Sequence, residues 1–355
     1  MNESKSNLER VRAIIRSQYF WGIVAIFLLL LINLIKDPSY LNLSYNPTTG
    51  AFVGNIIDIL RAAAPILMIA VGVCLVIATG GIDLSVGSVM VVSGAVTMEF
   101  LSAANQPDSI GAAALAILLA LLLSTVLGLV NGVLVAFVGL QPFITTLVMM
   151  LAGRGIAKVI TEGQNTSATN EPVRWIANGY AFGLPVVFLI AVAVIVVVSI
   201  VVRKSALGLM IEAIGIDPKA SRLAGLNRRG LLLTVYAISG LLAGIAGIFA
   251  TASVMTVDVS RTGYQLELDA ILAVVIGGTS LAGGKFSIGG AVIGALLIAT
   301  LDKTVLFLGV PSSATPAFKA IVIIALCLLS SERVRSLFRQ RRLTTPLTPK
   351  ETVPS

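Results

Sequence analysis

The residues best suited to chemistry lie in the segment GGIDLSVGS, residues 80–88, where one acid and two serines stand among glycines. A carboxylate such as Asp83, buried in a membrane, is the kind of group that couples transport to a proton or sodium gradient. No nucleophile with a base and an orienting group is visible in the sequence, so it predicts no catalytic site. Helix must break or bend at the two glycines, which makes the segment a candidate for a transport pathway rather than for an active site.

The sequence has few of the residues that metal, redox or nucleotide-binding sites need. Histidine is absent, and Cys74 and Cys327 stand alone in apolar runs, where we expect small packing residues and neither a metal site nor a cofactor. The segment TSLAGGKF resembles a phosphate-binding loop, but Thr279 replaces its first glycine and Phe286 the magnesium-binding Ser or Thr. We therefore expect any ATP hydrolysis to occur on a separate chain.

The composition indicates a membrane protein built of helices. Hydrophobic residues make up 57% of the 355 positions, and the mean hydropathy is +0.98, far above that of soluble domains. Apolar runs near 20 residues suit helices that cross about 30 Å of hydrocarbon. The fold class predicted is an all-α polytopic membrane protein with ten transmembrane helices, at residues 20–35, 56–79, 86–104, 111–138, 142–160, 184–202, 230–254, 268–281, 286–308 and 316–330.

The distribution of lysines and arginines predicts the orientation of this chain in the membrane. With both termini inside, the inner segments hold 17 of the 25 lysines and arginines and the outer segments hold six, which is the positive-inside pattern of a protein with cytoplasmic termini. This topology explains the net charge of +8 without nucleic acid. The domains expected are a cytoplasmic segment 1–19, a transmembrane domain 20–330 with a cytoplasmic loop 203–229, and a disordered cytoplasmic tail 331–355.

Glycine patterns mark both packing faces and a repeated break. Three GxxxG pairs predict close helix contacts, at Gly128/Gly132, Gly240/Gly244 and Gly290/Gly294. The pattern GG-x-x-L-x-x-G occurs twice, as Gly80, Gly81, Leu84 and Gly87 and as Gly277, Gly278, Leu281 and Gly284. Glycine-interrupted segments in two halves favour a transport pathway, although tight cytoplasmic turns would give the same pattern. The pathway residues predicted are Gly80, Gly81, Asp83, Leu84, Ser85, Gly277 and Gly278.

A short helix is predicted in the cytoplasmic loop. Asp217 suits an N-cap, Pro218 the first helical position and Gly225 the position after the helix. The helix should run from Pro218 to Ala224. In a basic loop it is either a solvated connector or a contact surface for another protein.

Four charged residues fall within the predicted spans, where an ionised group costs at least ~2.5 kcal/mol at mid-bilayer. They are Asp58, Glu99, Arg154 and Lys158. Arg154 and Lys158 are four residues apart and share a helix face, and Asp58 and Glu99 should lie toward the outer ends of their spans. We expect a structural ion pair, such as Arg154 with Asp58, rather than direct contact with a solute.

Three segments resemble one family. GGIDLSVGS, EAIGIDPKASRLAGL and ELDAILAVVIGGTSLAGGKFSIGG look like the signature regions of ribose- and galactose-type permeases of bacterial ABC importers, in the same order, over about residues 15–335. The galactofuranose-type permeases look most similar. The resemblance implies a multi-pass inner-membrane subunit that translocates a monosaccharide. It also implies that the loop helix docks into an ATPase subunit, through Asp217, Pro218, Lys219, Ala220, Ser221, Arg222, Leu223, Ala224 and Gly225.

The partners implied are an ABC ATPase, a periplasmic sugar-binding protein, a second permease copy or a sister permease, and membrane lipid. Two alternatives remain open. A branched-chain amino-acid permease would share the same architecture, and an ion-coupled secondary transporter would depend on Asp83.

Overall fold

The computed structural model describes residues 18–330 apart from 49, 107 and 312. The tail predicted for 331–355 and all but residues 18 and 19 of the predicted N-terminal segment lie outside the described residues. Each of the ten predicted spans coincides with helix: α2 (Gln18–Lys36), α3 (Asn55–Ala78), α4 (Val86–Ser102), α5 (Ile110–Val133), α6 (Pro142–Ile160), α8 (Val186–Lys204), α11 (Arg228–Val254), α12 (Leu266–Ile276), α13 (Ile288–Phe307) and α14 (Thr315–Ser330).

Six of these helical segments are long and apolar enough to cross a membrane in the described part of the chain. They comprise α3, α5 with the π-helical turn η1 (Leu134–Val138) that continues it, α6, α8, α11 and α13. Helix α4 has 17 residues and α12 only 11. At 1.5 Å per residue, α12 is about 16 Å long, half the thickness of a hydrocarbon core.

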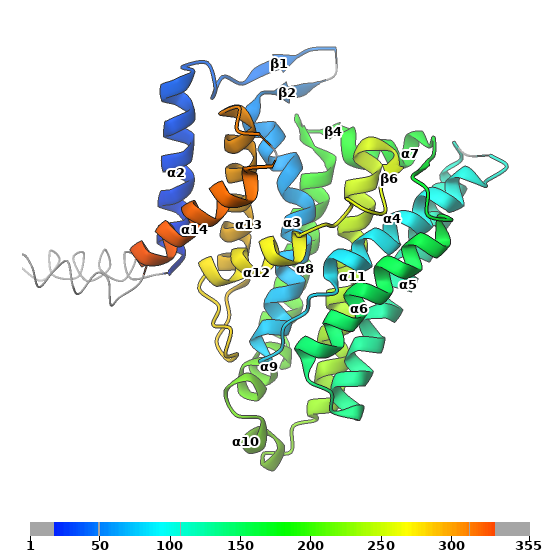
Figure 1. The fold of residues 1–355 in the computed structure, drawn as a ribbon, viewed down its shortest axis with the longest axis vertical. Coiled ribbons are helices and arrows are strands. Elements are labelled where there is room, and N and C mark those ends of the chain that lie inside the picture. The colour runs from blue at the N-terminus through cyan, green and yellow to red at the C-terminus, as the bar shows by residue number, and fades with distance from the viewer. Residues whose placement is uncertain (1–17, 49, 107, 312, 331–355) are drawn as a thin grey trace, which may run out of the picture.

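Small elements gather at the two ends of the helix bundle (Figure 1). One end, here called the hairpin end, carries α7 (Glu171–Asn178) and three two-stranded antiparallel pairs: β1 (Ser44–Asn46) with β2 (Ala51–Val53), β3 (Thr166–Ser167) with β6 (Thr256–Val257), and β4 (Tyr180–Ala181) with β5 (Leu184–Pro185). The opposite end, here called the loop end, carries α9 (Leu207–Ile216) and α10 (Pro218–Leu223). The sequence analysis did not predict α7 or α9.

The centre of the bundle is α11, which packs against α5, α3 and α4. Helix α3 is buried on nearly all sides from Ala63 to Ala78, as expected of a helix that is apolar all round. The GxxxG pairs lie at helix crossings, as predicted: the α-carbon of Gly240 is 3.0 Å from an ideal β-carbon built on Gly128, and a β-carbon on Gly294 would overlap Ala273 of α12. Glycine thus lets α5 approach α11, and α13 approach α12.

Candidate functional site

Helix α3 ends where the sequence predicts a break. Gly80 has φ +81, its amide donates to Ile77 O at 2.8 Å, and the amide of Gly81 donates to Val76 O at 3.2 Å. This pair of bonds is a Schellman motif, and its left-handed position favours glycine. Residues 81–85 then run without helical structure to the start of α4.

Asp83 is the centre of a buried hydrogen-bond network in this break. Its Oδ1 accepts from the Ser85 hydroxyl at 2.6 Å and from the Ser85 amide at 3.0 Å, and its Oδ2 accepts from the Ser239 hydroxyl of α11 at 2.8 Å. Asn131 of α5 donates to Ser85 Oγ at 2.8 Å. The carboxylate is 2% exposed, so these bonds compensate for its loss of water.

The predicted pathway residues of this segment are therefore packed against other helices. Leu84 and Ser85 are 9% and 1% exposed, and Thr146 of α6 donates to the Ile82 carbonyl at 3.0 Å. A solute could reach these side chains only if α4 moved away from α6 and α11. Their pathway role stays a hypothesis about another conformation.

The second glycine segment repeats the helix end of the first. Helix α12 ends at Ile276, Gly278 has φ +95, and the amides of Gly278 and Thr279 donate to Val275 O and Val274 O at 3.0 and 3.2 Å. Gly278 is thus the structural equivalent of Gly80. The sequence pattern instead paired Gly80 with Gly277, one residue earlier. Gly277 instead packs against Gly290 of α13.

The two glycine segments also touch each other. The amide of Gly284 donates to Ala78 O, the last residue of α3, at 2.9 Å. A β-carbon on Gly283 would lie 2.9 Å from the Gly80 α-carbon, and one on Gly215 of α9 would overlap both Ala78 O and the Gly284 amide. We call the contact of Gly80, Gly215, Gly283 and Gly284 the glycine junction. It joins α3, α9 and the loop after α12 through backbone alone.

The predicted loop helix is present, and its caps are confirmed. Asp217 accepts from the amides of Lys219 and Ala220 at 2.8 and 3.0 Å, and Gly225 has φ +82. The helix ends at Leu223, with Ala224 as its C-cap. Ser221 is buried, whereas Leu223 is 89% exposed. Leu223 therefore lies on the surface of α10, as single apolar residues commonly do.

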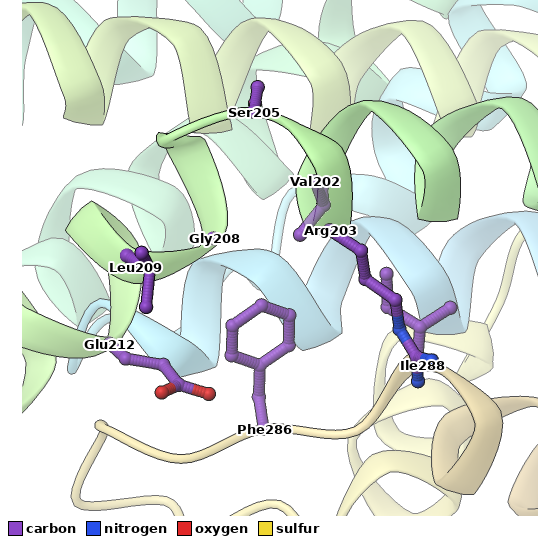
Figure 2. Close-up of a pocket in the computed structure, with 8 residues that line it drawn as sticks. All are labelled: Val202, Arg203, Ser205, Gly208, Leu209, Glu212, Phe286 and Ile288. Atoms are coloured by element: carbon purple, nitrogen blue, oxygen red, sulfur yellow. The ribbon is translucent and has the colours of Figure 1, made fainter.

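A cavity of about 280 Å³ lies beside this loop. It is lined by Val202, Arg203, Ser205, Gly208, Leu209, Glu212, Phe286 and Ile288. Figure 2 shows the Phe286 ring pointing from the loop toward α9, with Arg203 on one side and Glu212 on the other. The cavity thus separates the first residues of α9 from the loop after α12. Further along, at Gly215, α9 touches that same loop.

The predicted ion pair between Arg154 and Asp58 is wrong. Asp58 Oδ2 lies 3.9 Å from Lys303 Nζ of α13, and Arg154 Nη1 donates to Thr262 O at 3.5 Å. The reason is helix order, because α3 packs against α13 whereas α6 packs against α4 and α5. Charge complementarity alone could not identify the neighbours.

The other charged candidates have separate surroundings. Glu99 accepts a hydrogen bond from Thr166 of β3, and Lys158 is exposed. A triad that the sequence analysis missed joins Lys319 of α14 to Asp269 of α12 at 2.9 Å and to Asp302 of α13 at 2.7 Å. The missed signal was the presence of an acid in each of two neighbouring apolar segments.

Helices α4 and α12 begin next to each other, halfway between the two ends of the molecule (Figure 1). A β-carbon on Gly87 would overlap Gly263 O and Glu267 Oε2. Glu267 is 8% exposed, and its Oε2 is buried without a hydrogen-bond partner. Two interrupted helices that meet at mid-depth beside a buried acid are typical of transport sites.

Comparison with known proteins identifies relatives along almost the whole chain. Residues 55–330 match the family described as the permease component of branched-chain amino acid transport systems. The fructose import permease protein of Bifidobacterium longum is 52% identical over 331 residues, covering 92% of this chain and 91% of that protein.

Two further relatives carry other sugar names. The galactofuranose transporter permease protein of Escherichia coli K12 is 41% identical, over 89% of this chain and 91% of that protein. The ribose import permease protein of the same strain is 39% identical, over 79% of this chain and 87% of that protein. No solved structure matches the chain.

Proposed function

The chain belongs to the family of permease components of branched-chain amino acid transport systems, and from this premise we propose that it is the membrane-spanning permease of an ATP-driven importer of a monosaccharide. The observation that carries the proposal is the 52% identity to a fructose import permease over 92% of the chain. Relatives with galactofuranose and ribose in their names support a sugar as the cargo.

The proposed topology has ten transmembrane helices, with the loop end in the cytoplasm and the hairpin end outside the bacterial inner membrane. Six helices meet the length of a full crossing, and α2, α4, α12 and α14 complete the ten. The positive charges support this orientation, because residues 203–229, from the last turn of α8 to the first turn of α11, hold six lysines and arginines.

The proposed partners bind at the loop end and at the hairpin end of the molecule. An ATPase subunit docks on α10, where Leu223 is exposed and Asp217 fixes the helix start. A periplasmic sugar-binding protein delivers the sugar to the hairpin end, and a second permease, either a copy or a sister chain, completes the path. The permease itself makes and breaks no covalent bond.

The test is reconstitution of the permease with its ATPase and binding protein in lipid vesicles. Uptake of labelled D-fructose, D-ribose and D-galactose is compared with uptake of L-leucine. The proposal predicts ATP-dependent uptake of a sugar and none of leucine.

Two outcomes would contradict the proposal. Uptake of leucine alone would identify an amino-acid permease, as the family description allows. Uptake that continues without the ATPase but stops when a proton or sodium gradient is collapsed would identify an ion-coupled transporter.

A further inference from the structure

The segment that leads into α12 exposes polar side chains at an unusual depth. Tyr264 is 62% exposed, and Gln265, the N-cap of α12, is also exposed. The guanidinium of Arg154 on α6 lies 5.8 Å from the centre of the Tyr264 ring, within the range of a cation–π contact. Arg154 and Tyr264 thus form a pair on two elements, and Gln265 follows Tyr264 in the chain, at the edge of a pocket between α12 and α14.

The depth of this group follows from the position of α12. The loop after α12 descends toward the loop end of the molecule, where Gly284 bonds to the end of α3, whereas α12 itself lies halfway between the loop end and the hairpin end (Figure 1). In a hydrocarbon core about 30 Å thick, the first residues of α12 therefore lie near the middle.

An exposed polar group at this depth does not face lipid stably. An arginine at the centre of a bilayer is costly, and an amide needs hydrogen-bond partners that lipid does not supply. We therefore expect the half-buried Arg154 and the exposed Tyr264 and Gln265 to face water or another polar surface.

The backbone at this point is also strained. Gln265 has φ +63, a left-handed conformation that is uncommon for residues other than glycine, asparagine and aspartate. Strain of this kind persists where the surrounding structure imposes it, commonly at ligand sites.

Beneath the group lies Glu267, 8% exposed and with Oε2 lacking a hydrogen-bond partner. Because its side chain is buried, Glu267 is not counted among the contact residues.

We propose that Arg154, Tyr264 and Gln265 form a sugar-contact site halfway along the translocation path. A sugar offers a C–H face that packs on an aromatic ring, and hydroxyls that accept from a guanidinium and exchange hydrogen bonds with an amide. The Arg154–Tyr264 pair supplies the ring and the guanidinium, and the neighbouring Gln265 supplies the amide. The inference rests on the proposed function, which requires a polar path, and adds the residues that touch the cargo.

The first experiment measures water access. Tyr264→Cys, in a chain with Cys74→Ser and Cys327→Ser, is treated in vesicles with a charged, water-soluble thiol reagent. Labelling of this cysteine is expected, whereas Leu122→Cys on α5, at a residue that is 54% exposed on a helix of the apolar surface, should stay unlabelled. Equal resistance of both cysteines would overturn the site, and this result does not depend on which solute is carried.

The second experiment measures recognition, with D-fructose, D-ribose and D-galactose as probes. Tyr264→Leu should lower kcat/KM for the imported sugar by about threefold to tenfold, since the ring contact is lost. Gln265→Gly removes the amide and the strain together and should lower it also, whereas Gln265→Asn keeps an amide, tolerates the left-handed conformation and should retain most uptake. The matched control is Phe27→Leu, at an exposed aromatic residue of α2, which should leave uptake unchanged.

The outcomes separate the site from the transport function. Sugar uptake by the unchanged protein, together with unaltered kcat/KM in Tyr264→Leu and Gln265→Gly, would remove the contact site and leave the importer. Absence of sugar uptake by the unchanged protein would contradict the proposed function, while the labelling of Tyr264→Cys would still decide whether this face meets water.

Discussion

The substitution Gly215→Ala tests how movement of the cytoplasmic loop reaches the transmembrane helices. Gly215 of α9 lies against both the end of α3 and the loop after α12, and an added methyl group there would overlap Ala78 O and the Gly284 amide. The backbones would have to separate by about 1 Å or more to reach an ordinary van der Waals distance.

The cost can be estimated from the contacts. Overpacking at a close backbone contact costs about 1–3 kcal/mol, and loss of the 2.9 Å bond between Gly284 N and Ala78 O adds about 0.5–1.5 kcal/mol. A total near 2 kcal/mol or above changes the population of the joined arrangement by at least about 30-fold. The glycine junction should then be mostly open.

The assay is the number of sugar molecules imported per ATP hydrolysed in reconstituted vesicles. Helix α10 keeps its caps in Gly215→Ala, so the ATPase should still co-purify, but import per ATP should fall by tenfold or more. The matched control is Gly289→Ala, where an added β-carbon meets nothing within 4 Å. An unchanged ratio in Gly215→Ala, at normal abundance of the complex, would refute transmission through the junction.

Three further predictions follow from the site. Asp217→Ala removes the N-cap acceptor of α10, which costs about 0.5–2 kcal/mol of helix stability, and should reduce co-purification of the ATPase without reducing the amount of permease in the membrane. Leu84→Cys, with Cys74→Ser and Cys327→Ser, should react with a small thiol reagent only in one nucleotide state; equal reaction with and without trapped nucleotide would leave the segment as an ordinary turn. Lys319→Met leaves Asp269 and Asp302 unpaired in an apolar setting, and a buried pair that loses one partner costs about 3–5 kcal/mol, so the midpoint of thermal denaturation in detergent should fall, whereas Lys158→Met at an exposed position should not change it.

The sequence predicted the helices well because their signals are local. Apolar runs gave ten segments whose ends agree with the structure to within a few residues, except that the eighth was predicted to reach residue 281 whereas α12 ends at Ile276. Asp217, Pro218 and Gly225 defined α10 by capping chemistry alone. Helix α9 was missed because its 10 residues, LGLMIEAIGI, are too few for a span and have no side-chain cap at Ala206. A short apolar helix next to a basic loop gives no local start signal.

Contacts between helices were harder to predict, since they depend on which faces meet. The Arg154–Asp58 pair failed for this reason, and the triad around Lys319 was missed because its three members lie on α12, α13 and α14. The GxxxG prediction succeeded without knowledge of the partners, because any helix that approaches closely needs small residues there. Which helices approached could be found only from the structure.

The two glycine segments that interrupt the helices connect the glycine junction with the proposed sugar-contact site. At their loop-end sides, Gly80 and the segment 283–284 meet α9 in the glycine junction, and α9 continues into α10. On the other side of the first break α4 begins at mid-depth, and α12, which precedes the second break, begins beside it, where Gly87 lies against Glu267. A displacement of α10 therefore acts on the ends of the two helical segments that adjoin the proposed sugar contacts, and backbone contacts at the glycine junction transmit it. If this connection is correct, Gly215→Ala and Tyr264→Leu should reduce import in different ways: the first should lower import per ATP equally for every sugar, and the second should alter the preference among sugars at an unchanged ratio to ATP.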